Sequence, residues 1–284
     1  MSKVDLHLHS CVSDGRFSPA EVVTKAAAAG LTVIALTDHD NVDGIAPALE
    51  AAKKFPGLKV IPGVEISTDE PDGEVHVLGY FIDYTHPELL ATLQTMRESR
   101  QGRAQGMVTK LAGLGMPVEW KRVQEIAGDG SIGRPHIAQA LLEKGYIATI
   151  KEAFDKYIAF GGPAYVEREK ITPAEAVELI LRAGGLPVLA HPLFINNPET
   201  LIARLKPSGL AGIEVYYGQY TQEQIRTLAG LADKYGLTAT GGSDYHGLDD
   251  NAETMMGTVN VPMSAAEKLI TLAEHRTTKP ANPR

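Results

Sequence analysis

The feature that most constrains this chain is a regular alternation of short apolar segments with segments of amphipathic, helical spacing. The first unit is the apolar segment Val4–His9, followed by a helical pattern over Pro19–Ala29 that starts after a capping residue, Ser18, and stops at Gly30. The other predicted strands are Thr32–Thr37, Lys59–Ile66, Glu74–Phe81, Pro187–Ala190, Gly212–Tyr216 and Leu237–Thr240. The other predicted helices of these units are Gly44–Phe55, Pro173–Ala183, Gln222–Tyr235 and Ala265–His275. About seven strand-helix units predict an α/β fold with buried parallel strands, a barrel related to the eight-unit architecture, whose functional site lies at the C-terminal strand ends.

The alternation stops between residues 87 and 165, where apolar residues keep helical spacing and no convincing strand occurs. The later helices of this stretch are predicted at Glu119–Ala127, Pro135–Lys144 and Ile150–Ile158. We therefore expect an all-helical insertion over residues 101–164 that contributes to the substrate site. The barrel would be assembled from residues 1–100 and 165–284.

Most of the nine histidines lie at or just beyond the end of a predicted strand, and most of these have a carboxylate nearby. His7 and His9 are two residues apart on an extended chain, so both imidazoles face the same side. The candidate metal ligands are His7, His9, Asp14, His39, Glu65, His76, His191, Asp244 and His246. A single histidine of this kind is more often a hydrogen-bonded core residue. Six strand ends that deliver such ligands to one barrel rim instead predict a metal site.

Nine candidate ligands exceed the roughly four to six positions around one ion, so we expect two or three divalent ions with Glu65 or Asp244 bridging them. Nitrogen and oxygen donors without thiolates suit manganese first, with zinc or iron as alternatives. The three carboxylates Asp14, Glu65 and Asp244 supply less negative charge than such a metal cluster has positive charge. An anionic phosphate ester as substrate would supply part of the missing negative charge.

The segments HLHSCVSDG, TDHD, GVEIS, EVHVLGY, LAHP and GSDYH resemble the successive metal motifs of the PHP family, the polymerase and histidinol phosphatase superfamily. The resemblance implies a distorted seven-unit barrel, two or three metal ions held by the nine residues named above, and phosphoester hydrolysis. The insertion, with SIGRPHIAQAL, resembles the bacterial branch that acts on nucleoside 3′,5′-bisphosphates and trims short RNA. This branch implies removal of a 3′-phosphate to leave a nucleoside 5′-monophosphate, with short 5′-phosphorylated RNA as a further substrate.

The implied mechanism is attack on phosphorus by a metal-bound hydroxide, with no covalent phosphoenzyme. The leaving group needs an acid, for which Asp40 is one candidate beside a metal-bound water. Three alternative functions stay open. These are a histidinol-phosphate phosphatase, an amidohydrolase acting on C–N bonds, and a non-catalytic metal-dependent module that binds a nucleotide.

Arg134 and His136 lie at the start of a predicted helix, where exposed amide groups favour an anion. We expect both to bind a substrate phosphate, with Lys170 as a weaker candidate. The alternative is that Arg134 forms a salt bridge with the barrel and His136 caps the helix. Arg97, Arg100 and Arg103 recur every third residue of a helix, which is either a basic stripe for RNA or a solvated face.

The charge balance sets limits on partners and location. With 27 Lys and Arg against 35 Asp and Glu, the net charge of −8 disfavours a protein that coats long duplex nucleic acid. A small nucleotide or a short single strand at a metal centre is still compatible with it. The single cysteine, Cys11, fits a reducing compartment, and no apolar run reaches the length of about 18 residues that spans a membrane. We therefore expect a cytoplasmic protein with no membrane partner.

Overall fold

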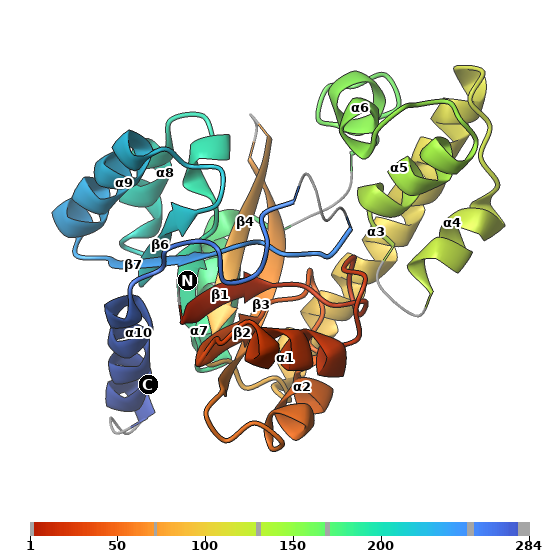
Figure 1. The fold of residues 1–284 in the computed structure, drawn as a ribbon. Helices are drawn as coiled ribbons and strands as arrows, with labels where there is room; N and C mark the ends of the chain where they lie inside the picture. The colour runs from red at the N-terminus through yellow and green to blue at the C-terminus, as the bar shows by residue number, and fades with distance from the viewer. Residues whose placement is uncertain (1–2, 71–72, 129–131, 168–170, 249–252, 278–284) are drawn as a thin grey trace.

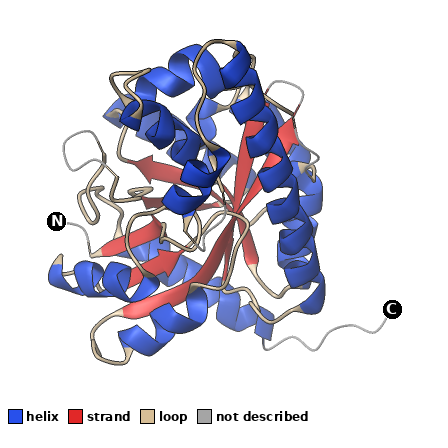
Figure 2. Cartoon of the chain, turned by 90° about the vertical axis from the view of Figure 1, so that its right-hand side faces the viewer, coloured by secondary structure: helices blue, strands red, loops and turns tan. Residues whose placement is uncertain are grey.

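Seven strands form one sheet in sequential order, β1 to β7, which curls into a nearly closed barrel (Figures 1 and 2). The computed structural model describes residues 3–70, 73–128, 132–167, 171–248 and 253–277. The strands are β1 Val4–Leu8, β2 Val33–Leu36, β3 Lys59–Glu70, β4 Gly73–Tyr80, β5 Leu186–Leu189, β6 Gly212–Tyr217 and β7 Thr238–Gly242. Backbone bonds close the ring: the His9 N–H donates to the Tyr245 carbonyl at 3.0 Å, and the Asp244 N–H donates to the His7 carbonyl at 3.0 Å. The α/β barrel expected from the sequence is confirmed.

The prediction that all strands run parallel is wrong for β4. This strand pairs antiparallel with β3 and also with β5, whereas the other neighbouring pairs are parallel. The cause is local. β3 extends to Glu70 and returns directly as β4 from Gly73, so no helix crosses over between them. His76 consequently lies inside a strand and reaches the metal rim from a long hairpin.

Six helices, α1, α2 and α7 to α10, belong to the barrel, at Pro19–Ala28, Ile45–Ala52, Pro173–Arg182, Pro198–Leu205, Gln222–Tyr235 and Met263–Thr277. Ser18 caps α1 as predicted, and Glu21 completes a capping box with it. Both α8 and the short 3₁₀ helix η2 (Pro192–Phe194) were missing from the sequence prediction. Each spans few residues, so neither gives a sustained apolar period.

The remaining helices form a lobe beside the barrel (Figure 1). They are α3 Pro87–Gly113, α4 Trp120–Ala127, α5 Arg134–Glu143, α6 Ile150–Ala153 and a π-helical turn, η1, at Phe154–Ile158. Early residues of α3, such as Leu89 and Leu93, pack in the barrel core, whereas Met107 and Leu111 pack in a separate core shared with α4 and α5. The boundary expected at residue 100 therefore falls inside one continuous helix. The division into two domains stays a prediction.

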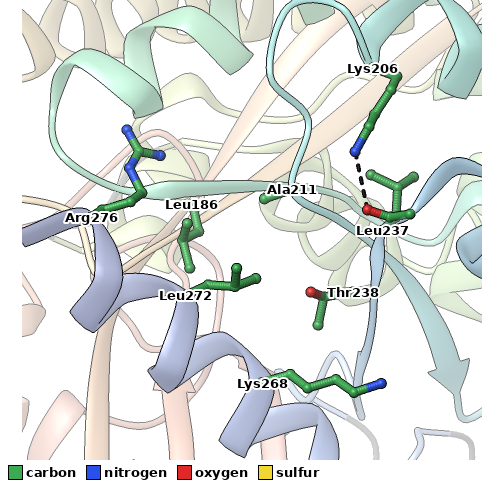
Figure 3. Close-up of a pocket in the computed structure, with 9 residues that line it drawn as sticks. Leu186, Lys206, Ala211, Leu237, Thr238, Lys268, Leu272 and Arg276 are labelled. Carbon is green, nitrogen blue, oxygen red and sulfur yellow. Dashed lines mark hydrogen bonds between the residues drawn. The ribbon is translucent and has the colours of Figure 1, made fainter. Parts of the chain in front are cut away.

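One cavity of ≈ 370 Å³ lies at the N-terminal ends of β5, β6 and β7, against α10 (Figure 3). It is lined by Leu186, Lys206, Ala211, Gly236, Leu237, Thr238, Lys268, Leu272 and Arg276. None of the described candidate ligands is among them. In barrels of this type the N-terminal end serves stability, and chemistry takes place at the other end. No helix in the described parts of the chain is both long enough and apolar enough to cross a bilayer.

The junction of β7 and β1 has no space for an additional atom at Gly242. A Cβ there would lie 2.5 Å from both the Cβ and the backbone nitrogen of His7. We expect Gly242→Ala to lower the free energy of unfolding by about 1–3 kcal/mol, because the strands must separate. Gly230→Ala is the matched control, since nothing lies within 4 Å of that position on α9, and helix propensity should raise stability by up to about 1 kcal/mol. Urea unfolding of the metal-free proteins measures both, and equal midpoints would contradict the prediction.

Candidate metal centre

The nine predicted ligands converge at the C-terminal rim of the barrel. Three overlapping groups bring their ligand atoms within 4.8 Å of one another. These groups are His9, Asp14, His39 and His246; His7, His9, Glu65 and Asp244; and His39, Glu65 and His76. The ninth candidate, His191, joins the cluster through Glu65, with 3.1 Å between its Nε2 and the carboxylate Oε1. Residues that are far apart in sequence thus form one continuous site.

The Glu65 carboxylate lies at the middle of this cluster and is 1% exposed. Five imidazoles contact it, at 3.1 Å for His7, 3.3 Å for His9, 3.2 Å for His39, 2.8 Å for His76 and 3.1 Å for His191. Burial opposes ionisation of Glu65, yet its electrostatic interactions with His39, His7 and His76 hold its pKa well below the usual range. Both oxygens are engaged, which is the arrangement expected of a bridging carboxylate.

The other members of the cluster carry opposed pKa shifts. Burial lowers the pKa of His39 to about 3, although Glu65 and Asp14 oppose that shift. Burial also disfavours the charged form of His246, but Asp14 and Asp244 raise its pKa to about 10. Burial likewise opposes the ionised forms of Asp14 and Asp244, whose pKa values nearby histidines nevertheless hold well below the usual range. In such a cluster the carboxylates are anionic and the imidazoles compete for protons. Divalent cations can take the place of these protons.

Several buried ligand atoms have no hydrogen-bond partner in the described part of the chain. They are Nδ1 and Nε2 of His9, Oδ1 of Asp14, Nδ1 of His39, Nδ1 of His191 and Oδ1 of Asp244. Buried polar atoms in native structures are nearly always satisfied, so such a concentration calls for an explanation. Divalent ions fit it, because neutral imidazole nitrogens and carboxylate oxygens are the donors that manganese, zinc or iron accept.

A buried carboxylate that sequence analysis missed, Glu214 on β6, orients two of the ligands. Its Oε1 lies 3.1 Å from Nδ1 of His7, and its Oε2 accepts the His191 N–H at 2.8 Å. The first contact fixes the His7 ring so that Nε2 faces the cluster. A charged residue inside the apolar strand GIEVYY was the available signal. This residue does not share the spacing of the metal motifs, so the sequence pattern alone does not identify it as part of the site.

Two further contacts fix the backbone that carries the ligands. Asp38 accepts bonds from the Ser10 N–H and from the Ser10 and Ser13 hydroxyls, each at 2.7 Å, and so holds the loop between His9 and Asp14. The Tyr217 hydroxyl donates to Oδ2 of Asp244 at 2.8 Å. Positive φ angles at His191 (25°) and Asp244 (57°) place strain at the site itself. The surrounding bonds hold these residues in conformations that the chain alone disfavours.

Asp40 lies beside the cluster but is bound to cations of α3. Its Oδ2 accepts from Arg100 Nε at 2.6 Å, its Oδ1 accepts the Ser67 N–H at 2.8 Å, and its carbonyl accepts from Arg97 at 3.0 Å. An ion pair with a guanidinium favours the ionised carboxylate, which cannot donate a proton. The role of Asp40 as leaving-group acid stays a prediction that this pairing disfavours.

The solvated-face reading of the arginine stripe is wrong for two of its three members. The side chain of Arg100 is 11% exposed and that of Arg103 is 5% exposed. Both project from α3 toward acidic residues near the metal rim instead of into solvent. Helical spacing alone could not show this, because the direction of the face depends on how α3 crosses the barrel.

The predicted phosphate-binding residues lie where α5 begins. Arg134 is ion-paired with Glu74, and the His136 Nδ1 accepts the Gly133 N–H at 2.9 Å. That bond places the proton of a neutral imidazole on Nε2. A Cβ at Gly133 would be 3.8 Å from Oδ2 of Asp14, so the helix N-terminus adjoins the metal ligands. Lys170, the third candidate, lies outside the described residues.

A barrel whose C-terminal rim carries a buried histidine and carboxylate cluster defines the class of metal-dependent hydrolases built on this fold. The model of the PHP domain matches residues 5–169, and the chain belongs to that family. It is 38% identical to a 5′-3′ exoribonuclease of Haemophilus influenzae over 248 residues, 86% of this chain and 90% of the relative. It is 35% identical over 272 residues to a 3′,5′-nucleoside bisphosphate phosphatase of Chromobacterium violaceum, 92% of this chain and 93% of the relative.

A solved structure agrees with this assignment. A candidate metal-dependent phosphoesterase of Bifidobacterium adolescentis superposes with a TM-score of 0.86 at 29% identity, covering 95% of this chain and 96% of that one. The agreement over nearly the full length of both chains includes the helical lobe as well as the barrel.

We expect Glu65→Gln to weaken metal binding by more than the roughly 10–100-fold that follows from disturbing an outer partner of a ligand. The reason is that the substitution removes the charge shared by five histidines. Glu70→Gln is the matched control, since this glutamate lies on the same strand but pairs with Arg204. Metal content after dialysis and calorimetric titration of the metal-free proteins measure the effect. Equal retention of metal by both variants would refute a bridging role for Glu65.

Proposed function

We propose that this protein is a metal-dependent phosphoesterase that removes the 3′-phosphate from nucleoside 3′,5′-bisphosphates and leaves a nucleoside 5′-monophosphate. The observation that carries the proposal is the placement of three arginines beside a multi-ligand metal centre, one of which, Arg103, has buried N–H groups without a partner among the described residues. The nine ligands would hold two or three divalent ions, with manganese proposed first and zinc or iron as alternatives. When bound, such ions polarise the phosphoryl oxygens and supply a nucleophile at neutral pH.

The arginine cluster supports a second phosphate in the substrate. Nε and Nη2 of Arg103 are buried and have no hydrogen-bond partner among the described residues, while Nη1 lies 3.5 Å from Glu74. Glu74 is also the partner of Arg134, so one carboxylate is shared by two guanidiniums. Burial lowers the pKa of Arg103, with partial compensation from Glu74. An incoming phosphate would supply the acceptors that these N–H groups lack.

The N-terminus of α5 adds neutral donors to the same place. Gly133 lies between Asp14 and Arg100, and a Cβ there would be 3.9 Å from Arg100 Nη1. A helix N-terminus attracts anions through its unpaired N–H groups and its dipole. Nε2 of His136 would carry a proton for the same ligand. We infer that the 5′-phosphate is held by Arg103, Arg134 and His136 while the 3′-phosphate meets the metal ligands.

A short 5′-phosphorylated RNA presents the same groups in the same order. Hydrolysis adds a water oxygen to phosphorus, breaks the bond between phosphorus and O3′, and delivers a proton to O3′. In the bisphosphate this releases inorganic phosphate, and in RNA it releases a nucleoside 5′-monophosphate and leaves a 5′-phosphate on the shortened strand. One site could therefore perform the activities that the names of the two relatives describe.

The alternative functions make different demands on the charges and ligands of this site. Histidinol phosphate carries an ammonium group and one phosphate, and the three arginines near the rim would repel its positive end. A non-catalytic metal-dependent module would use the same ligand atoms of His9 and Asp244, and turnover of a phosphomonoester distinguishes a phosphoesterase from it. The net charge of −8 still disfavours long duplex nucleic acid, while the local arginines suit a small nucleotide or a short single strand.

The substrate assignment can be tested by phosphate release from the manganese-loaded protein. We expect adenosine 3′,5′-bisphosphate to be converted to 5′-AMP faster than 3′-AMP loses its phosphate, and 5′-AMP and histidinol phosphate to be poor substrates. His191→Ala should lower turnover by at least about 10-fold, because a ligand that touches Glu65 is lost. Preference for histidinol phosphate, or no turnover of any monoester, would contradict the proposal.

The second phosphate site makes a separate prediction. Arg103→Ala and Arg134→Ala should each lower kcat/KM for the bisphosphate by about 10–100-fold, the effect of a lost charge-assisted contact, and should change turnover of 3′-AMP little. Arg122→Ala is the matched control, since this lobe arginine is exposed and pairs with Glu143. Steady-state kinetics of each variant with the bisphosphate and with 3′-AMP measures these two effects. An equal loss on both would show that the arginines support the fold or the metals instead of the 5′-phosphate.

A further inference from the structure

An exposed aromatic ring lies beside the metal centre on the β5 and β6 side. Phe194 ends η2, the short helix that follows His191, and is 58% exposed, the highest value among the described large hydrophobic residues. Its ring centroid is 5.6 Å from the ring of His191 and 5.7 Å from that of Tyr217. Tyr217 in turn donates to the metal-ligand candidate Asp244. The exposed ring thus contacts the candidate ligand His191 directly and reaches the candidate ligand Asp244 through Tyr217.

The surrounding contacts hold this ring in a fixed position. The Phe194 N–H donates to the His191 carbonyl at 3.1 Å, and the preceding Leu193 N–H donates to the Tyr220 hydroxyl at 3.1 Å. The ring meets Tyr217 at 84° and Tyr220 at 62°, and these contacts fix its orientation. A flat apolar surface that is exposed, ordered and adjacent to a site for phosphate chemistry is suited to stack a nucleobase.

The metal cluster separates Phe194 from the arginines. Phe194 contacts His191, His191 contacts Glu65, and Glu65 contacts His39. His39 then approaches Asp14, with 3.8 Å between Nε2 and Oδ2, and Asp14 adjoins the start of α5. Figure 1 shows the same arrangement at the level of elements, with α8, which follows η2, on one side of the sheet and the helical lobe on the other.

We propose that Phe194 stacks the base of the nucleotide that follows the scissile phosphate in a short 5′-phosphorylated RNA. This inference rests on the proposed function. The nucleotide whose O3′ leaves is held through its 5′-phosphate on the arginine side. The group that stays on phosphorus is O5′ of the next nucleoside, which continues past the cluster toward β5 and β6. A nucleoside 3′,5′-bisphosphate has no residue there, so Phe194 discriminates oligonucleotides from the bisphosphate.

The test compares the manganese-loaded native protein with Phe194→Ala, Phe194→Leu and Phe194→Trp. The substrates are adenosine 3′,5′-bisphosphate, the 5′-phosphorylated dinucleotide pApA, and the same dinucleotide with an abasic second ribose. We expect Phe194→Ala and Phe194→Leu to lower kcat/KM for pApA by about 5–100-fold, the effect of one lost base stack. Phe194→Trp should restore it. Turnover of the bisphosphate and of the abasic substrate should change by less than about 2-fold, because neither substrate places a base against Phe194.

Leu272→Ala is the matched control, because this exposed apolar residue lies on α10 at the opposite end of the barrel (Figure 3). An equal fall on pApA and on the bisphosphate would overturn the inference, since Phe194 would then act on the metal ligands or the fold. Unchanged kinetics on pApA would overturn it too. So would a native protein that hydrolyses the bisphosphate but not pApA. Failure of the native protein on every substrate would instead overturn the proposed function, and with it this inference.

Discussion

The structure depends on one buried anion, the carboxylate of Glu65, and on the five imidazoles around it. Placing a charge in a protein interior is costly unless partners compensate for the lost water. Here the compensation comes from β1, β4 and the segments after β2 and β5, each of which contributes at least one histidine to Glu65 on β3. The cluster thereby joins five strands through one group. Divalent ions would take over the role of the imidazolium charges.

An outer layer of carboxylates makes this arrangement rigid. Glu214 fixes the His7 ring and the His191 backbone, and Asp38 fixes the loop between His9 and Asp14. Asp5 performs the same task at the closing seam, where it accepts the N–H groups of Ser243 and Gly257 at 2.9 Å and 3.0 Å. The positive φ angles at two ligands are stable only because such bonds determine the backbone around them. Hydrogen bonds from these outer carboxylates therefore hold the candidate metal ligands in fixed orientations.

The helical lobe gives the site its distribution of charge. The chain as a whole is acidic, yet α3 and α5 bring three arginines to the edge of the metal centre, where Asp40 and Glu74 hold them in place. Of these three arginines, only Arg103 has buried N–H groups without a partner among the described residues. Local cations at short range outweigh a distant net charge, so an acidic protein can still select a substrate with two phosphates. The exposed Phe194 on the other side of the cluster extends the same site toward a longer substrate.

The sequence by itself determined the barrel, most element boundaries to within a few residues, and the nine candidate ligands, because periodicity and strand-end motifs are local properties. Only the tertiary structure decided the antiparallel course of β4, since the length of β3 sets where the chain turns. It also decided that Arg100 and Arg103 face inward, that Glu214 contacts His7, and that Phe194 lies beside His191. A residue's spacing records which face of its own element it occupies. What that face meets depends on how elements distant in sequence pack together.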